Sequence, residues 1–492
     1  MIKWNFPGNQ DGQIKGVADA GIENFNGTEL ASLARENCQN SLDAALDDAN
    51  PNVLVEFERY FIEEDKIPGI VEYRGILQKC KLFWDKSKSE KAKTFLKTAV
   101  SKAHEKKGFV LRISDYNTTG LSDPYTNSSD AFDFKFDGWN ALIKIDGGAN
   151  KDGDKAGAFG IGKSAPFSNS YYRLVFYRTL NQAGERASQG ISRLMSYPDG
   201  QNMTSGVGYY GNPDGNNPVE NIIELESLNQ RSQTGTDVFV YGFKANSDWE
   251  DEIITAMLEN FLMSIYNGQL CVKVQKSEIN SKTLGGYMER VHRDYPGPTK
   301  GTYGNYLCLT RTEDVKTFSM DFHGMGTLQL RILVDPTEKL DRKVLIVRKA
   351  GMKLFRLGNI SKLVPFTGIL ELKGKAINNY FRAMETVAHD NWEPGRHSDP
   401  KQAKRYYEEI KEWIRGIVAE LAEHTSDDEM DVEGLSGVLQ QEPEAVESGE
   451  SDNKRENLND HLGNIDIIKR PESTPSKGFF YGKGDAGKSE ST

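Results

Sequence analysis

Three polar side chains within residues 29–46, ELASLARENCQNSLDAAL, have types and spacing that suit a metal–nucleotide site. Glu36, Asn40 and Asp43 stand at i, i+4 and i+7, so a helix would bring them to one face. An ordinary solvated face favours Glu, Lys, Gln or Arg, because Asn and Asp are poorer helix formers. A plain surface helix remains the alternative for this stretch taken alone. Small and apolar residues fall on the opposite face: Leu30, Ala34, Cys38, Ser41, Leu42 and Ala45.

A second candidate stretch, GFVLRISDYNTTGLS, predicts a buried strand that runs into a polar turn. The turn begins at Asp115 and includes Asn117 and Gly120. A third stretch, at Gly235 and Thr236, begins another predicted strand. Each has an ordinary explanation by itself, an Asx turn and a threonine at a strand start respectively.

A Gly-rich segment ends in GAFGIGKSAPF and satisfies the pattern GxxxxGK[ST] over residues 157–164. A phosphate-binding loop of that class must connect a buried strand to a helix. Here the preceding IDGGANKDGDKA is too polar for such a strand, and the following APFSNSYYRLVFY has strand character. We therefore expect Lys163 to belong to a Gly-rich lid instead of a P-loop.

The order of these motifs resembles the GHKL ATPases, the superfamily of gyrase B, the ninety-kilodalton heat-shock chaperones, histidine kinases and MutL. The order is ExxxN on a helix, DxNxxG after a strand, a Gly-rich lid, and GT at a strand start. The resemblance covers about half of the chain, and RENCQNSLDA looks most like bacterial MORC/MutL-like ATPases. The family's second motif is usually DxGxG; here Asn117 replaces the first glycine, and asparagine tolerates left-handed geometry.

The resemblance implies a role for each polar residue that matches. Glu36 would be the general base for the water that attacks the γ-phosphate. Asn40 would coordinate Mg²⁺ through its amide oxygen, and Asp43 would support the pocket wall. Asp115 would accept a hydrogen bond from the adenine amino group, and Thr236 would reinforce that contact. ATP and Mg²⁺ are the implied cofactors.

Glycines and lysines complete the implied site. Gly120 would let the backbone approach the base, and Lys163 would add a positive charge beside the triphosphate. A basic residue from the second half of the chain would reach the γ-phosphate, with Lys349 of VRKAGMKL as the candidate and a solvated strand end as the alternative. The lid would wrap the phosphates through Gly157, Gly160 and Gly162.

The elements that must position these residues predict an α+β protein in several parts. Residues 1–245 would be the GHKL ATP-binding domain, a Bergerat fold with helices on a mixed β-sheet and a lid at about 146–170. Residues 246–397 would form an S5-like α+β transducer domain, followed by a C-terminal helix at 398–424. Predicted strands lie at 52–63, 109–113, 172–180, 191–198, 236–243, 270–274, 327–335, 343–351 and 368–374, and further helices at 248–268 and 376–392.

Charge is distributed unevenly over the 492 residues. The net charge is −11, of which residues 425–492 carry −9, so residues 1–424 are close to neutral. This Ser/Glu/Gly-rich tail lacks periodicity and is predicted to be disordered. Residues 83–107 are Lys-rich, and a solvated basic face is favoured there over a nucleic-acid contact.

Composition limits the class of protein. No run of apolar residues is long enough to span a membrane, and no secretory signal is visible. The four cysteines are scattered without a CxxC pair, which argues against structural zinc and a disulfide framework and favours a reducing cytoplasm.

The resemblance to the GHKL ATPases predicts a Mg²⁺-dependent ATPase that acts as a switch. ATP binding would order the lid and the N-terminal arm and promote homodimerisation, and hydrolysis would reset the dimer. Partner proteins would supply any effector activity, DNA remains possible, and the resemblance suggests a DNA-transaction or phage-defence (restriction-like) system. Two alternatives stay open: a nucleotide-dependent interaction module without hydrolysis, and a chaperone-like machine without a role on DNA.

Overall fold

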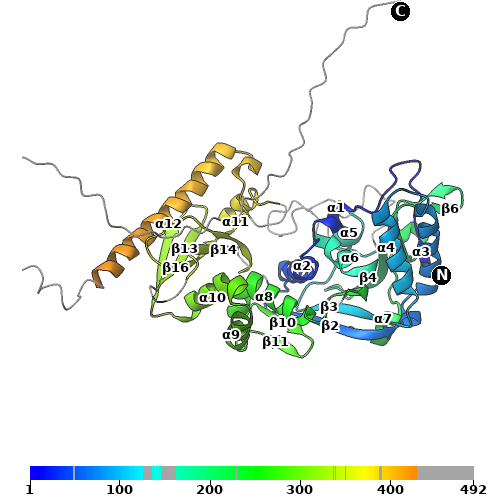
Figure 1. Ribbon diagram of the computed structural model, residues 1–492, viewed down its shortest axis with the longest axis horizontal. Helices are drawn as coiled ribbons and strands as arrows, with labels where there is room; N and C mark the ends of the chain where they lie inside the picture. The colour runs from blue at the N-terminus through cyan, green and yellow to red at the C-terminus, as the bar shows by residue number, and fades with distance from the viewer. Residues whose placement is uncertain are drawn as a thin grey trace, which may run out of the picture. The chain divides into compact units, whose positions relative to one another are not determined.

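The computed structural model describes residues 1–47, 50–125, 136, 138–145, 162–228, 230–244, 246–335, 337, 340–348, 351–386 and 391–428 (Figure 1). Statements below about what is absent refer to these residues. The α+β class predicted from the sequence is confirmed, with one large mixed sheet, one smaller mixed sheet and helices packed on both. The predicted tail beyond Asp428 lies outside the described residues, as does most of the predicted lid.

The large sheet has nine strands in the order β1-β8-β5-β4-β9-β3-β2-β10-β11. Every neighbouring pair is antiparallel except β2 and β10, which run parallel. The strands are β1 (Lys3–Asn5), β2 (Val53–Glu63), β3 (Lys107–Tyr116), β4 (Ser170–Leu180), β5 (Arg186–Arg193), β8 (Val207–Gly211), β9 (Gly235–Phe243), β10 (Leu270–Val274) and β11 (Ser277–Ile279).

The central strands are buried on both faces. In β4, Val175 and Tyr177 belong to one hydrophobic core, while the alternating Leu174 and Phe176 belong to a second core on the other face. This explains the nearly continuous apolar runs of β4 and β9, because alternation disappears when both faces of a strand are covered. The sheet is therefore the middle layer of three.

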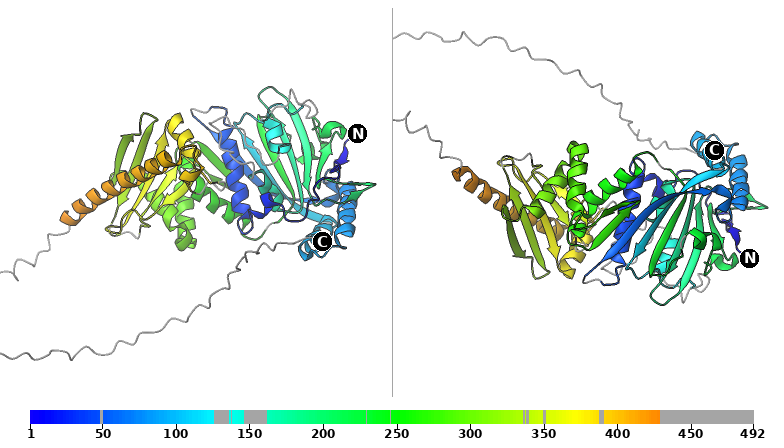
Figure 2. Two further views of the ribbon diagram at one scale, coloured as in Figure 1. Left: turned by 90° about the horizontal axis from the view of Figure 1, so that it is seen from above. Right: turned by 90° about the horizontal axis from the view of Figure 1, so that it is seen from below.

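Helices α2 (Glu29–Asp43), α6 (Ala165–Ser168) and α8 (Trp249–Tyr266) cover the first face. Their apolar side chains pack in the same core as Val55 of β2 and Ile113 of β3. Helices α3 (Ile70–Trp84) and α4 (Glu90–Ala103) cover the second face, where they pack on residues such as Phe176 and Tyr241. Figure 2 shows α2 and α4 on opposite sides of the strands.

The smaller sheet has the order β12-β13-β16-β14-β15, with β14 and β16 as its parallel pair. Its core includes residues of the last helix, α12, such as Ile410 and Ile414, which pack onto the sheet. The elements of this part are α9 (Leu284–Asp294), α10 (Pro296–Thr310), β12 (Val315–Asp321), β13 (Thr327–Val334), β14 (Lys343–Val347), β15 (Lys353–Leu357), β16 (Phe366–Lys373), α11 (Lys375–Arg382), η4 (Pro394–Arg396) and α12 (Pro400–Asp428).

Shorter elements connect the strands of the large sheet. They are α1 (Ala20–Glu23), η1 (Glu64–Lys66), α5 (Gly138–Ile143), η2 (Gly162–Ser164), the two-stranded pair β6 (Pro198–Asp199) and β7 (Asn202–Met203), η3 (Asp214–Asn216) and α7 (Ile223–Leu228).

Several predicted elements need correction in extent. The helix predicted from residue 29 begins there after Thr28 but ends at Asp43, because Ala45 bridges to Thr118 and Leu46 donates to the Asn117 carbonyl. The helix predicted at 376–392 is only α11, and the C-terminal helix continues to Asp428. The strand predicted at 270–274 is confirmed with these bounds as β10, and it pairs with β2 of the large sheet. The division into domains at residues 245/246 and 397/398 stays a prediction.

Candidate functional site

Helix α2 presents the polar stripe predicted from its spacing. Its opposite side is buried through Leu30, Leu33, Ala34, Cys38 and Leu42, which orients the helix on the sheet. Asn40 is exposed and Asp43 is partly exposed, whereas the Glu36 side chain is only 13% exposed. Arg35 Nη2 donates to Glu36 Oε1 at 3.0 Å. One carboxylate is thus held in place while the amide one turn later remains accessible.

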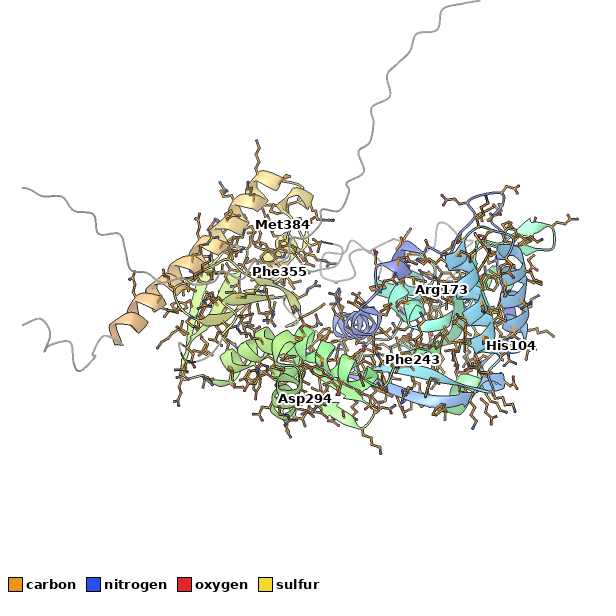
Figure 3. The ribbon with its side chains drawn as sticks, in the orientation of Figure 1. His104, Arg173, Phe243, Asp294, Phe355 and Met384 are labelled. Carbon is orange, nitrogen blue, oxygen red and sulfur yellow. The ribbon has the colours of Figure 1, made fainter. Side chains whose placement is uncertain are left out.

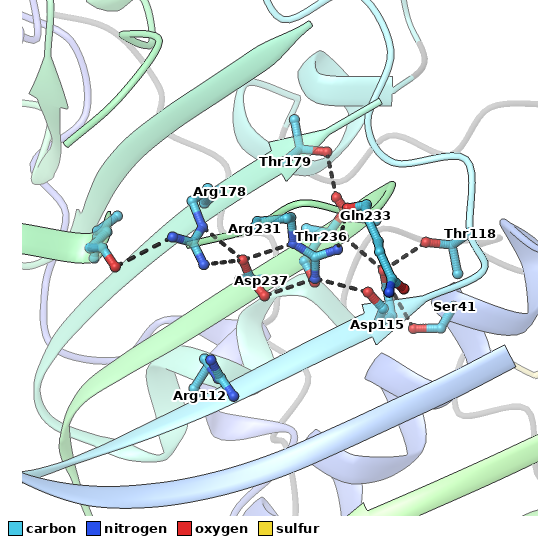
Figure 4. Close-up of polar contacts among 12 residues, drawn as sticks. Ser41, Arg112, Asp115, Thr118, Arg178, Thr179, Arg231, Gln233, Thr236 and Asp237 are labelled. Atoms are coloured by element: carbon cyan, nitrogen blue, oxygen red, sulfur yellow. Dashed lines mark hydrogen bonds and ion pairs between the residues drawn. The ribbon is translucent and has the colours of Figure 1, made fainter. Parts of the chain in front are cut away.

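Asp115 lies near the end of β3, and its carboxylate receives three hydrogen bonds (Figure 4). Oδ1 accepts from Thr118 Oγ1 and from the backbone N–H of Thr236, each at 2.7 Å. Oδ2 accepts from Ser41 Oγ of α2 at 2.9 Å. The Asn37 carbonyl is the alternative acceptor for the same hydroxyl proton. A carboxylate has about four acceptor positions, so Oδ2 can accept one further donor from a ligand.

Burial raises the pKa of Asp115, and this effect is opposed by the positive charge of Arg231 and by the three hydrogen bonds. The carboxyl group therefore loses its charge at a higher pH than an ordinary aspartate. A ligand that binds as a hydrogen-bond donor to the carboxylate would bind less well as the pH falls through this raised pKa.

An ion-pair network behind Asp115 fixes the start of β9. Arg231 donates through Nη2 to the Asp115 carbonyl at 2.8 Å, and through Nε and Nη2 to the carboxylate of Asp237. Arg178 of β4 binds the same carboxylate through Nε at 2.7 Å. All three side chains are buried. Burial alone would raise the pKa of Asp237, but the two arginines lower it to about 2.

Glycine is required where β9 begins. Gly235 has a φ of 140°, and a Cβ there would overlap the Asp115 carbonyl and approach its carboxylate and the Arg231 guanidinium. The neighbouring Thr236 is thereby brought close enough to donate its backbone N–H to Asp115. The hydrogen bond observed from the predicted residue Thr236 to Asp115 thus comes from its main chain.

The turn after β3 adopts left-handed geometry at both predicted positions. Asn117 has a φ of 61° and donates through Nδ2 to the Asn52 carbonyl. Gly120 has a φ of 67°, and a Cβ there would overlap the Leu180 carbonyl. The need for glycine at position 120 is therefore explained by chain packing against the end of β4.

The end of the Gly-rich segment lies directly on α2. A Cβ at Gly162 would overlap the Glu36 carboxylate, so a larger residue there would displace either the segment or the Glu36 side chain. Lys163 and Ser164 are buried within η2, and Arg193 of β5 donates to Ser164 Oγ at 2.8 Å. After η2 the chain makes only the four-residue α6 and enters β4, so the long helix of a P-loop is absent there. Gly157 and Gly160 lie outside the described residues.

Lys349 also lies outside the described residues, but Lys353 of the same VRKAGMKL segment is described. It contacts the Glu259 carboxylate of α8. Burial lowers the pKa of Lys353, Glu259 opposes this effect, and the positive charge of Arg35 on α2 lowers it further. The segment therefore places Lys353 close enough to Arg35, which binds Glu36, for their charges to interact.

The structure thus gathers the predicted residues into two groups. Glu36, Asn40 and Asp43 share α2 with Gly162 beside Glu36, while Asp115 and Thr236 meet at the strand ends and are joined to α2 through Ser41. Sequence interpretation missed a set of supporting residues: Ser41, Thr118, Arg178, Arg231 and Asp237. Asp237, a charge within the apolar run TDVFVYGF, was the one available signal.

The donor set is compatible with the implied nucleotide and metal. The free acceptor position of Asp115 and the exposed amide of Asn40 suit an amino group and a hard cation. The described residues contain no group of three or more His, Cys, Asp or Glu side chains that could hold a metal ion. Mg²⁺ held mainly by phosphate and water oxygens needs no such group.

No protein-family model and no curated protein matches the chain. The ATP-binding domain of topoisomerase IV from Francisella tularensis, solved with a small-molecule inhibitor, aligns with 86% of this chain and 98% of that chain. The identity is 10% and the TM-score is 0.32, which is too low to establish a common fold. No helix among the described residues is long and apolar enough to cross a membrane.

Proposed function

We propose that this protein is a Mg²⁺-dependent ATPase of the GHKL type. The observation that carries the proposal is the placement of Glu36 and Asn40 on one helix, with Gly162 on the Glu36 carboxylate and Ser41 of the same helix on Asp115. Helix α2 thereby carries the proposed base and metal ligand and contacts both the phosphate-side loop and the proposed adenine acceptor.

At the adenine end, Asp115 Oδ2 accepts a hydrogen bond from the exocyclic amino group. Thr118 and the Thr236 backbone hold the other carboxylate oxygen, so the acceptor keeps a fixed direction. Arg231 ties the Asp115 and Thr236 carbonyls together, which positions both strand ends before the ligand arrives. Preorganisation of this kind lowers the entropic cost of binding.

At the phosphate end, Glu36 orients a water molecule and accepts its proton as the oxygen attacks the γ-phosphorus and the bond to ADP breaks. Arg35 holds the Glu36 carboxylate in one orientation. The Asn40 amide oxygen would bind Mg²⁺, which neutralises charge on the phosphates when it is bound. Lys353 is the described candidate for a basic contact from the second half of the chain.

The N-terminal arm supports a switching role. Arg173 donates to the Val17 carbonyl, and Lys15 pairs with Asp19 at 2.7 Å. Asp19 caps α1, which packs against η2 and α6 at the end of the Gly-rich segment. We therefore propose that nucleotide binding changes the lid and the arm together and promotes homodimerisation. A DNA-transaction or phage-defence context with partner effectors, as in MORC/MutL-like ATPases, is proposed from the sequence resemblance alone.

Steady-state turnover and nucleotide binding of three variants test this function. Glu36→Ala should reduce kcat by about 10²–10⁴-fold, the usual contribution of a general base, and leave ATP binding intact. Asp115→Asn should weaken ATP binding by about tenfold to a hundredfold, because a charge-assisted acceptor is removed. Glu408→Ala, on the exposed side of α12, is the control and should match the wild type.

Retention of full turnover by Glu36→Ala would overturn the hydrolytic mechanism. ATP binding without measurable turnover in the wild type, with or without DNA, would favour the nucleotide-dependent interaction module. Stimulation by unfolded protein and not by DNA would favour the chaperone-like machine. The mass in solution with and without a non-hydrolysable analogue tests the dimer.

A further inference from the structure

Helices α3 and α4 form a strongly basic part of an acidic protein. Residues 79–107 contain ten lysines and only three acidic residues, within a chain whose net charge is −11. The apolar side of α4 is buried through Ala92, Leu96, Ala99 and Ala103. Burial of this side fixes α4 on the sheet and holds its lysine side outward.

Helix α4 is held on the sheet by a buried contact. Arg173 of β4 lies with its guanidinium 4.5 Å from the Phe95 ring, between α4 and the sheet. Figure 3 labels Arg173 in this region and His104 near the C-terminal end of α4. Helix α4 is therefore a well-anchored support of 14 residues, about 21 Å long.

Half of the ten lysines have their charge compensated. Ion pairs join Lys79 to Asp199, Lys81 to Asp85, Lys91 to Glu23, Lys93 to Glu90 and Lys102 to Glu105. Five others are exposed and form no ion pair within the described part of the chain: Lys86, Lys88, Lys97, Lys106 and Lys107. They lie before, within and after α4, so the excess positive charge extends along its length. We call these five residues the α4 lysine face.

Exposed hydroxyl groups lie among these lysines. Thr94, Thr98 and Ser101 are exposed on α4, and Lys97 lies between them in the sequence. Lysines and hydroxyls together are the groups that contact nucleic-acid phosphates without reading sequence. Leu82 of α3 is an exposed large apolar side chain near the N-terminal end of α4, whereas the exposed residues of α4 itself include none.

We propose that the α4 lysine face binds the phosphate backbone of double-stranded DNA without sequence preference. A duplex carries one charge per ~1.7 Å of its axis, so lysines before, within and after a helix of this length can contact several phosphates at once. The net charge of residues 1–424 does not reveal this face, because acidic residues elsewhere in that range offset the charge of its lysines. DNA binding at this face does not require ATP hydrolysis, so it is measured without nucleotide.

Fluorescence anisotropy with a duplex of about 20 base pairs tests the proposal on the full-length protein over a salt series. Changing all five lysines of the α4 lysine face to Gln should weaken binding by at least about tenfold and reduce the salt slope by about 0.9 for each phosphate that the variant no longer neutralises. The matched control changes five exposed lysines on other elements, which form no ion pair with any described residue, and it gives the same change in net charge: Lys276, Lys282, Lys343, Lys362 and Lys401.

The control should retain most of the wild-type affinity and salt slope, and circular dichroism should show both variants folded. Equal weakening in the two variants, or unchanged binding by the α4 variant, would overturn the proposal. The competing occupant is the protein's own segment 427–450, which has nine acidic and no basic residues. Binding of that peptide to the wild type but not to the α4 variant, with DNA binding unchanged, would assign the face to the tail instead.

Discussion

Asp115 and Asp237 lie on paired strands, yet their surroundings give their carboxyl groups opposite proton affinities. Asp237 is bound by the guanidinium groups of Arg178 and Arg231, which hold its pKa at about 2. Asp115 receives only neutral donors on its carboxylate, and burial raises its pKa. The first carboxylate is structural and stays charged, whereas the second can exchange a proton or a ligand donor.

Glu64 gives a pH prediction at the residue scale. It is buried in η1 beside Gly108, and burial raises its pKa to about 7, opposed by the hydrogen bond from Tyr172 and by Arg74. Because the folded pKa lies above the unfolded value, its stabilising contribution is complete below about pH 4.5 and is lost as the pH rises through 7. The free energy of unfolding of Glu64→Gln should therefore exceed that of the wild type by about 3 kcal/mol at pH 8.5.

Urea unfolding at pH 4.5, 5.5 and 8.5 measures this difference, which should shrink toward the lowest pH. Glu105→Gln, at an exposed position nearby, is the control and should show little dependence on pH. An equal effect of Glu64→Gln at the three pH values would contradict the prediction, since it would show that Glu64 does not change its charge over this range.

Sequence could predict that Glu36, Asn40 and Asp43 share one helix, because this depends only on local spacing. It could not predict Arg178 and Arg231, because an ion pair across strands depends on register, and these residues are separated from Asp115 by 63 and 116 positions. Their discovery required the pairing of β3, β9 and β4. The assigned roles themselves stay predictions until activity is measured.

At the scale of elements, apolar periodicity identified the helices and strands with buried faces, including α2, α8, β2 and β9. It missed α10, whose PGPTKGTYGNYLCLT contains two prolines and three glycines. Tertiary contacts override this weak propensity: Asn305 donates to Thr367 and Gly368 of β16, and Thr302 accepts from Arg356 of β15. Both prolines also lie in the first turn, where their missing N–H costs least.

The junction of η2 with α2 gives an element-scale prediction. Gly162→Ala places a methyl group against the Glu36 carboxylate, so either the Gly-rich segment or Glu36 must move. Because positioning dominates phosphoryl transfer, kcat for ATP should fall by at least about tenfold. Turnover is compared with that of Gly286→Ala in α9, where a Cβ meets nothing within 4 Å. Equal turnover in the two variants would show that η2 does not constrain Glu36.

At the scale of the whole molecule, α8 connects the two sheets. The core on its faces contains Val240 of the large sheet and also Leu345 and Ile369 of the smaller sheet. Strand β10 follows α8 and returns to the large sheet beside β2. Residues 246–279 therefore contribute to the packing of both parts, and this shared core could not be predicted from periodicity because the partners of an apolar face are not encoded locally.

Leu262→Ala tests whether this core makes the two sheets cooperative. Leu262 of α8 is 2% exposed, and its truncation should cost about 2–5 kcal/mol of unfolding free energy. Hydrogen exchange of β9 and of β16 should then accelerate together, because both strands share the core that is weakened. Leu363→Ala, at a side chain that is 73% exposed, should leave exchange in both strands unchanged. Acceleration confined to one sheet would instead mean that the sheets unfold as independent domains.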